Sequence, residues 1–136
     1  MTKKYLNELT FKIIGAAIKV HQTLGPGLLE SVYHRCLAYE LKERNIQFDY
    51  EAIVPIYYGE IELDANLRCD FFVSDCIVLE LKCVDEIKPI FKAQILTYMK
   101  LLAAPKGILI NFNCTNLFNH GQTTYVNEFF RFLPDE

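Results

Sequence analysis

Three charged residues that could hold a metal ion or assist a hydrolysis lie near the middle of the sequence. Asp70 stands ten residues before the tripeptide Glu80-Leu81-Lys82, and both lie in stretches with the pattern of β-strands. Side chains alternate between the faces of a strand, so Glu80 and Lys82 leave by the same face, which Asp70 on the partner strand can also reach. Ionised groups on an otherwise apolar sheet need a partner, and a divalent cation would serve.

A simpler interpretation of Glu80 and Lys82 is a solvated strand face with a weak ion pair, which is the usual meaning of Glu-x-Lys on a strand. The residues around this pair are apolar and typical of a central strand: Val78, Leu79, Leu81 and Val84. A charged pair on such a strand is unusual. The sequence therefore favours a functional pair.

The elements that must position these residues are predicted from hydrophobic periodicity and turn signals, which include a helix stop at Gly25-Pro26-Gly27 and a tight turn at Ser74-Asp75. The expected helices are 6–24, 28–44 and 89–102, and the expected strands are 47–57, 61–63, the hairpin 70–82, 107–112 and 123–126. We write their order as α-α-β-β-β-α-β-(β). A helix that crosses from the Glu80 strand to the Gly107 strand indicates an α/β fold with a mixed central sheet flanked by helices.

Three further polar residues are candidates for the same site. Glu30 begins the second expected helix on the side of its apolar stripe, although a glutamate there also simply complements the helix dipole. Gln94 and Tyr98 are four residues apart and share a face of the third helix. They could line a site above the sheet, or they could be hydrogen-bonded groups of the core.

The chemistry that fits these residues is phosphodiester hydrolysis. Asp70, Glu80 and Glu30 are hard oxygen ligands of the kind that Mg²⁺ or Mn²⁺ prefers, and such a metal makes hydroxide available near neutral pH. Lys82 would orient the attacking water or neutralise developing charge. The expected positions of His21, His34 and His120, on helices and in a loop, suggest no general base, and no Gly-rich phosphate loop is evident.

Composition narrows the class of protein. The 136 residues suggest one domain, 1–136, and a net charge of −3 rules out binding to nucleic acid through bulk positive charge. Nucleic-acid contact would need a local patch, with the metal offsetting the acidic site. Five cysteines without a Cys-x-x-Cys predict reduced thiols in a cytoplasmic protein, and no apolar stretch predicts a membrane span or a secretory signal.

The motifs resemble a known family. Residues 27–33, Gly-Leu-Leu-Glu-Ser-Val-Tyr, look like the signature of the bacterial GxxExxY proteins. Asp70 with Glu80-Leu81-Lys82 is similar to the core of the PD-(D/E)xK nuclease superfamily, to which that family is assigned. Gln94 and Tyr98 resemble the Gln-x-x-x-Tyr motif of RecB-like members. The resemblance runs from about residue 4 to residue 112 and implies the restriction-endonuclease-like fold.

The resemblance also implies roles. Asp70, Glu80 and the backbone carbonyl of Leu81 would ligate Mg²⁺ or Mn²⁺, and Lys82 would be the catalytic lysine. The extra acidic group that several members place on an N-terminal helix would be Glu30. Gln94 would position a water or the lysine, and Tyr98 would face the phosphate backbone as a substrate-binding residue.

Some positions depart from the family pattern. Cys69 stands where proline is common before the aspartate, and Lys88 stands where a Thr or Ser helix cap is expected. The tail after Asn113 matches no part of the pattern.

Two functions remain open from the sequence. The first is a Mg²⁺- or Mn²⁺-dependent nuclease, with DNA favoured over RNA as its substrate. The second is a catalytically silent module that keeps the nuclease fold and binds nucleic acid or a protein partner. Inactive relatives usually lose the lysine or a carboxylate, and none is missing here, which favours catalysis. Eight Tyr and ten Phe leave enough apolar surface for a homodimer.

Overall fold

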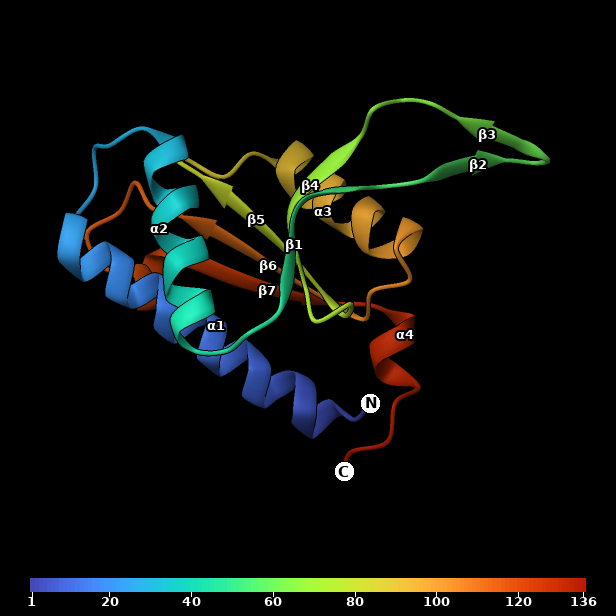
Figure 1. Cartoon of the computed structure of the whole chain (residues 1–136), viewed down its shortest axis with the longest axis horizontal. Helices are drawn as coiled ribbons and strands as arrows, with labels where there is room; N and C mark the ends of the chain where they lie inside the picture. Colours follow the sequence, from blue (N-terminus) through green and yellow to red (C-terminus); the bar gives the residue numbers. More distant parts are fainter.

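A five-stranded mixed sheet forms the centre of the computed structural model, which describes residues 1–136 (Figure 1). In spatial order its strands are β1 (Phe48–Ile53), β4 (Arg68–Val73), β5 (Ile77–Lys82), β6 (Lys106–Asn111) and β7 (Gln122–Val126). All neighbours are antiparallel except β5 and β6. These two run parallel because helix α3 (Pro89–Leu101) carries the chain back between them. The mixed sheet with flanking helices is consistent with the predicted restriction-endonuclease-like fold.

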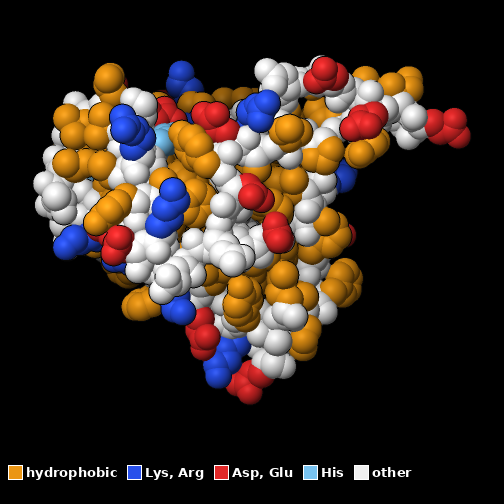
Figure 2. Space-filling model, viewed as in Figure 1, with side chains coloured by type: hydrophobic (Ala, Val, Ile, Leu, Met, Phe, Trp, Pro, Cys, Tyr) orange, Lys and Arg blue, Asp and Glu red, His pale blue; other side chains and the backbone are white.

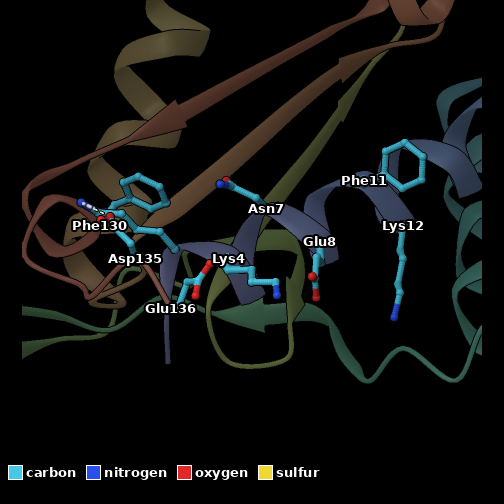
Figure 3. A pocket seen from close by; sticks show the side chains of 9 residues that line it. Lys4, Asn7, Glu8, Phe11, Lys12, Phe130, Asp135 and Glu136 are labelled. Atoms are coloured by element: carbon cyan, nitrogen blue, oxygen red, sulfur yellow. Dashed lines mark ion pairs between the residues drawn. The ribbon is translucent and has the colours of Figure 1, made fainter.

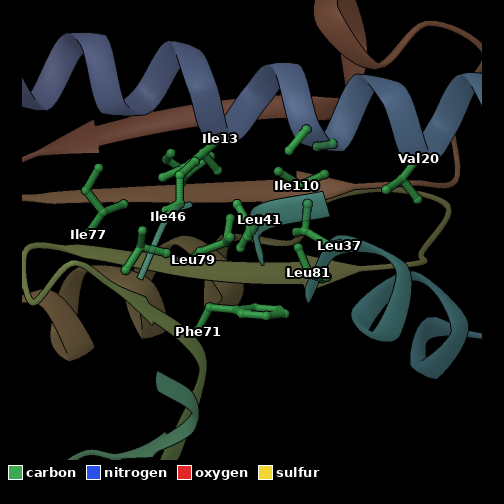
Figure 4. Packing of buried hydrophobic residues seen from close by; sticks show 14 of the residues in the cluster. Ile13, Val20, Leu37, Leu41, Ile46, Phe71, Ile77, Leu79, Leu81 and Ile110 are labelled. Carbon is green, nitrogen blue, oxygen red and sulfur yellow. The ribbon is translucent and has the colours of Figure 1, made fainter. Parts of the chain in front are cut away.

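Helices α1 (Lys3–Leu24) and α2 (Glu30–Glu43) cover one face of the sheet and build the larger core with it. Figure 4 shows Ile13 and Val20 of α1 facing the strands, with Leu79 and Leu81 of β5 beneath them. The stop between the helices is Gly25, whose φ of 70° suits glycine and whose N–H bonds the carbonyl of His21. The α1 and α2 boundaries lie within three residues of those predicted.

Helix α3 covers the opposite face with a smaller apolar cluster. Ile77, Leu79 and Leu81 of β5 point to α1 and α2, whereas Val78 points to α3. Glu80 and Lys82 continue the Val78 side of the strand, as predicted from the alternation of side chains. The helix packs so closely on β6 that a Cβ added to Gly107 would lie 2.6 Å from the sulfur of Met99.

A narrow hairpin projects from the body of the molecule (Figure 1). It consists of β2 (Ile56–Tyr58) and β3 (Ile61–Leu63), which pair only with each other. The single strand predicted for residues 47–57 is therefore wrong. Instead, β1 ends at Ile53, and Val54 still donates its N–H to the carbonyl of Leu67. The chain leaves the main sheet at Pro55 and forms β2 from Ile56. The predicted order counted three strands before α3, and the structure has five.

The two ends of the chain lie side by side. The N–H groups of Lys3 and Lys4 donate to the carbonyls of Pro134 and Asp135, and Lys3 forms an ion pair with Asp135 at 3.6 Å. A hollow of about 700 Å³ lies there, and Phe11 and Phe130 are among its walls (Figure 3). The tail also contains two unpredicted elements, a π-helix (Leu117–Gly121) and α4 (Glu128–Arg131). No helix has the length and hydropathy required to cross a membrane.

Candidate metal centre

The site begins where the β4–β5 pairing gives way to carboxylate hydrogen bonds. The paired residues run from Val73 and Ile77 to Phe71 and Leu79. Beyond them, the N–H of Asp70 donates to Oε2 of Glu80 at 2.9 Å, and the N–H of Leu81 donates to Oδ2 of Asp70 at 2.8 Å. Each carboxylate is thus fixed to the backbone of the opposite strand. The structure therefore brings the two predicted carboxylates together with little freedom to move apart.

Glu80 lies in an environment that disfavours its charge. The residue is 5% exposed, and burial, followed by the negative charge of Asp70, raises the pKa of its carboxyl to about 9. Lys82 lowers this pKa only weakly by comparison. Its ammonium instead lies 4.7 Å from the centroid of the Phe91 ring. Two adjacent carboxylates without a close cation have the electrostatics of a cation site.

Helix α2 adds two donors to this site. Nε2 of His34 lies 3.4 Å from Oε1 of Glu30 and 3.6 Å from Oδ2 of Asp70. One donor atom from each of these residues lies within 4.8 Å of the others. His34 was considered only as a general base from the sequence and was not predicted as a metal ligand. The signal was its spacing, because residues four apart on a helix lie on one face, and Glu30 was already a candidate.

Tyr50 is a second residue that the sequence analysis missed. Its hydroxyl lies 3.0 Å from Nδ1 of His34, the ring nitrogen that faces away from Asp70. The ring of Phe71 packs against both, with centroids 5.8 Å from His34 and 5.1 Å from Tyr50. When the hydroxyl accepts a hydrogen bond from the Nδ1–H, the lone pair of Nε2 points at the carboxylates. No local pattern in the sequence connects Tyr50 with α2.

Gln94 and Tyr98 form the predicted pair on α3. Nε2 of Gln94 donates to the hydroxyl of Tyr98 at 2.9 Å. Tyr98 is only 4% exposed, and its pKa is raised by burial and then by the charge of Glu80. It therefore lies near the buried carboxylate. This placement favours the hydrogen-bonded core role over the predicted contact with the phosphate backbone.

The donor set fits a divalent cation. Carboxylate oxygens from Glu30 and Asp70 suit Mg²⁺ and Mn²⁺, and the imidazole of His34 adds a ligand that transition metals accept. Glu80 lies beside them through its contact with Asp70. The N–H of Leu81 is already bonded to Asp70, and its carbonyl remains a predicted ligand.

A family model described as the PD-(D/E)XK nuclease superfamily matches residues 7–123. The chain belongs to the PD-(D/E)XK nuclease superfamily. The matched range contains every residue of the site described above. No curated protein and no solved structure matches the chain. The superfamily is thus shown, and the narrower GxxExxY assignment rests on the resemblance of residues 27–33 alone.

Proposed function

We propose that this protein is a divalent-metal-dependent nuclease that hydrolyses phosphodiester bonds, with DNA as its favoured substrate. The observation that carries the proposal is the convergence of Glu30 and His34 of α2 with Asp70 of β4. The buried Glu80 lies beside them, on the strand that also carries Lys82. A chain of the PD-(D/E)XK nuclease superfamily that had lost its activity would be expected to lack part of this set. Here the two carboxylates, Asp70 and Glu80, and the lysine, Lys82, are all present.

The side chains divide the work. Glu30, His34, Asp70 and Glu80 would hold the cation, which when bound polarises a phosphate and lowers the pKa of a water. Lys82 supplies a positive charge on the same strand face as Glu80 and can stabilise charge that develops on the phosphate oxygens. In the structure this ammonium forms a cation–π contact with the ring of Phe91 on α3.

The imidazole of His34 bears on which metal is used. Mg²⁺ prefers oxygen ligands, whereas first-row transition metals such as Mn²⁺ also bind imidazole nitrogen. We therefore expect Mn²⁺ to bind more tightly than Mg²⁺. A His34→Gln variant should bind Mn²⁺ more weakly and reduce the difference between the two ions.

The GxxExxY assignment is also part of the proposal, and the hydrogen bonds around Tyr33 support it. Its hydroxyl donates to the carbonyl of Gly25 at 2.6 Å and accepts from the N–H of Leu28 at 3.2 Å. The tyrosine of the signature thus fixes the loop before α2. The glutamate of the signature, Glu30, is the first residue of that helix, so the loop sets its position.

A titration with Mn²⁺ by calorimetry is the first test. Wild type should bind Mn²⁺, Asp70→Ala should not, and Asp64→Ala, which removes an exposed carboxylate elsewhere, should match wild type. Equal binding by wild type and Asp70→Ala would refute the metal centre. Absence of binding in wild type would favour the silent nuclease-fold module.

Cleavage of single- and double-stranded DNA and RNA by the Mn²⁺-loaded protein is the second test. Lys82→Ala should lose cleavage and keep Mn²⁺ binding, because its ammonium is not a ligand. Lys88→Ala, at an exposed lysine before α3, is the matched control and should retain activity. Cleavage by Lys82→Ala at the wild-type rate would contradict the assigned role.

A further inference from the structure

The projecting hairpin exposes apolar side chains that nothing in the chain covers. We call residues 55–64, which contain β2 and β3, the arm. Its large apolar residues are exposed on both strands: Tyr57 by 63%, Tyr58 by 78%, Ile61 by 59% and Leu63 by 46%. An isolated two-stranded hairpin is marginally stable in water, and clustered exposed apolar residues mark interaction sites. The arm is therefore expected to be covered by a partner.

Charge selects the kind of partner. The segment from Asn45 to Leu67 contains five acidic residues and no lysine or arginine, and Glu60, Glu62 and Asp64 lie on the arm itself. Acidic and hydrophobic side chains alternate along the arm in Figure 2. Such a surface repels the phosphates of nucleic acid. Its complement is an apolar protein groove with basic residues.

A groove of this kind lies between α1 and α2 of the same chain. It has a volume of about 560 Å³, and its apolar lining is Val20, Leu24, Val32, Cys36 and Tyr39. Lys19 and Arg35 supply its positive charge. The one acidic residue of the lining, Glu40, is neutralised by Arg44 at 2.7 Å. The groove therefore matches the arm in both apolar character and charge.

The arm cannot fill the groove of its own chain. Figure 1 shows the arm at one end of the long axis of the molecule, while α2 and the C-terminal half of α1 lie at the other end. We propose that the arm of one copy docks into the α1–α2 groove of a second copy. Because two different surfaces meet, an open series of copies leaves one arm and one groove free, so association continues into a chain or closes into a ring, of which a dimer with two reciprocal contacts is the smallest. The proposal does not depend on nuclease activity.

Complementation between two variants tests this contact. The arm variant carries Tyr58→Asp and Ile61→Asp, which face each other across β2 and β3, and the groove variant carries Lys19→Glu and Arg35→Glu. In sedimentation velocity, wild type should associate as concentration rises, and each variant alone should stay monomeric. The equimolar mixture should stop at a heterodimer, because only one intact arm and one intact groove remain.

The outcomes separate the alternatives. Wild type that stays monomeric up to millimolar concentration, or a mixture that stays monomeric, would overturn the proposal. A wild-type oligomer that both the arm variant and the groove variant still form would point to a different contact and would also overturn it. Lys12→Glu with Lys100→Glu makes the same charge change at exposed sites outside the groove and should associate like wild type. All substituted side chains lie outside the two cores, and circular dichroism would verify that each variant is folded.

Discussion

Glu80 should dominate the pH dependence of stability in the metal-free protein. Burial and the charge of Asp70 raise its pKa from 4.5 to about 9 in the folded state. Between these two values the folded protein keeps the Glu80 proton while the unfolded chain has lost it. Folding therefore takes up a proton in this window, and the free energy of unfolding falls as the pH rises.

The magnitude follows from the size of the window. Each pH unit in which only the unfolded chain is ionised costs about 1.4 kcal/mol, so roughly 3 kcal/mol is lost between pH 5 and pH 7. A Glu80→Gln variant copies the protonated form, because its amide can accept from the N–H of Asp70 and donate to the Asp70 carboxylate. At pH 7 this variant should be more stable than the metal-free wild type by about 3 kcal/mol.

Urea unfolding in the presence of EDTA at pH 5, 6, 7 and 8 measures this effect. Subtracting the free energy of unfolding of wild type from that of Glu80→Gln at each pH cancels the contribution of the other titrating groups. Glu60→Gln on the exposed arm is the control. The difference should grow with pH. Parallel curves for wild type and Glu80→Gln would refute the reasoning. Addition of Mn²⁺ at pH 7 should stabilise wild type more than Glu80→Gln, since the cation compensates the charge.

Two further substitutions address the shell around the site and the packing beneath it. Tyr50→Phe keeps the ring but removes the hydroxyl beside His34, so calorimetry should show Mn²⁺ affinity lower by about 10- to 100-fold; unchanged affinity would exclude an orienting role. Gly107→Ala places a Cβ 2.6 Å from the Met99 sulfur and should lower the free energy of unfolding by about 1–3 kcal/mol. Gly15→Ala, where no atom lies within 4 Å of the added Cβ, is its control and should not destabilise.

The fold was largely predictable because its signals are local. Apolar periodicity, the Gly25 stop and the Ser74-Asp75 turn place the helices and the central hairpin within a few residues of their observed bounds. Ser74 and Asp75 both have positive φ, as a tight turn between paired strands requires. The shared strand face of Glu80 and Lys82 then followed from the alternation of side chains on β5.

The strands 61–63 and 123–126 were predicted, but the departure of the arm from the main sheet and the helices of the tail were not, because tertiary contacts determine them. Helix α4 has four residues and is preceded by its N-cap Asn127, whose side chain accepts from the N–H of Phe130 and donates to the carbonyl of Ala104. Such a short helix depends on packing, since its own hydrogen bonds do not stabilise it. The contact of Tyr50 with His34 joins β1 to α2 across sixteen residues and leaves no periodic signal.

Asp70 acts both as an electrostatic group and as a backbone anchor, and these functions can be separated. Asp70→Ala removes the charge and also the hydrogen bond from the N–H of Leu81. Asp70→Asn keeps an oxygen that can accept this bond, but it removes the charge that, after burial, most raises the pKa of Glu80. We therefore expect Asp70→Asn to bind Mn²⁺ much more weakly than wild type and, in EDTA at pH 7, to be more stable than wild type.

Opposite changes in metal affinity and stability are the signature of a site arranged for a cation. Calorimetry and urea unfolding of the same Asp70→Asn preparation would measure both. A variant that lost stability together with Mn²⁺ binding would show that Asp70 serves mainly as a structural anchor between β4 and β5. At pH 7 the metal-free protein keeps a Glu80 proton that the unfolded chain has lost, which lowers its stability, and binding of the cation in place of this proton removes the cost. The close approach of the Asp70 and Glu80 carboxyl groups thus lowers the stability of the metal-free protein and, for the same reason, makes the site bind metal.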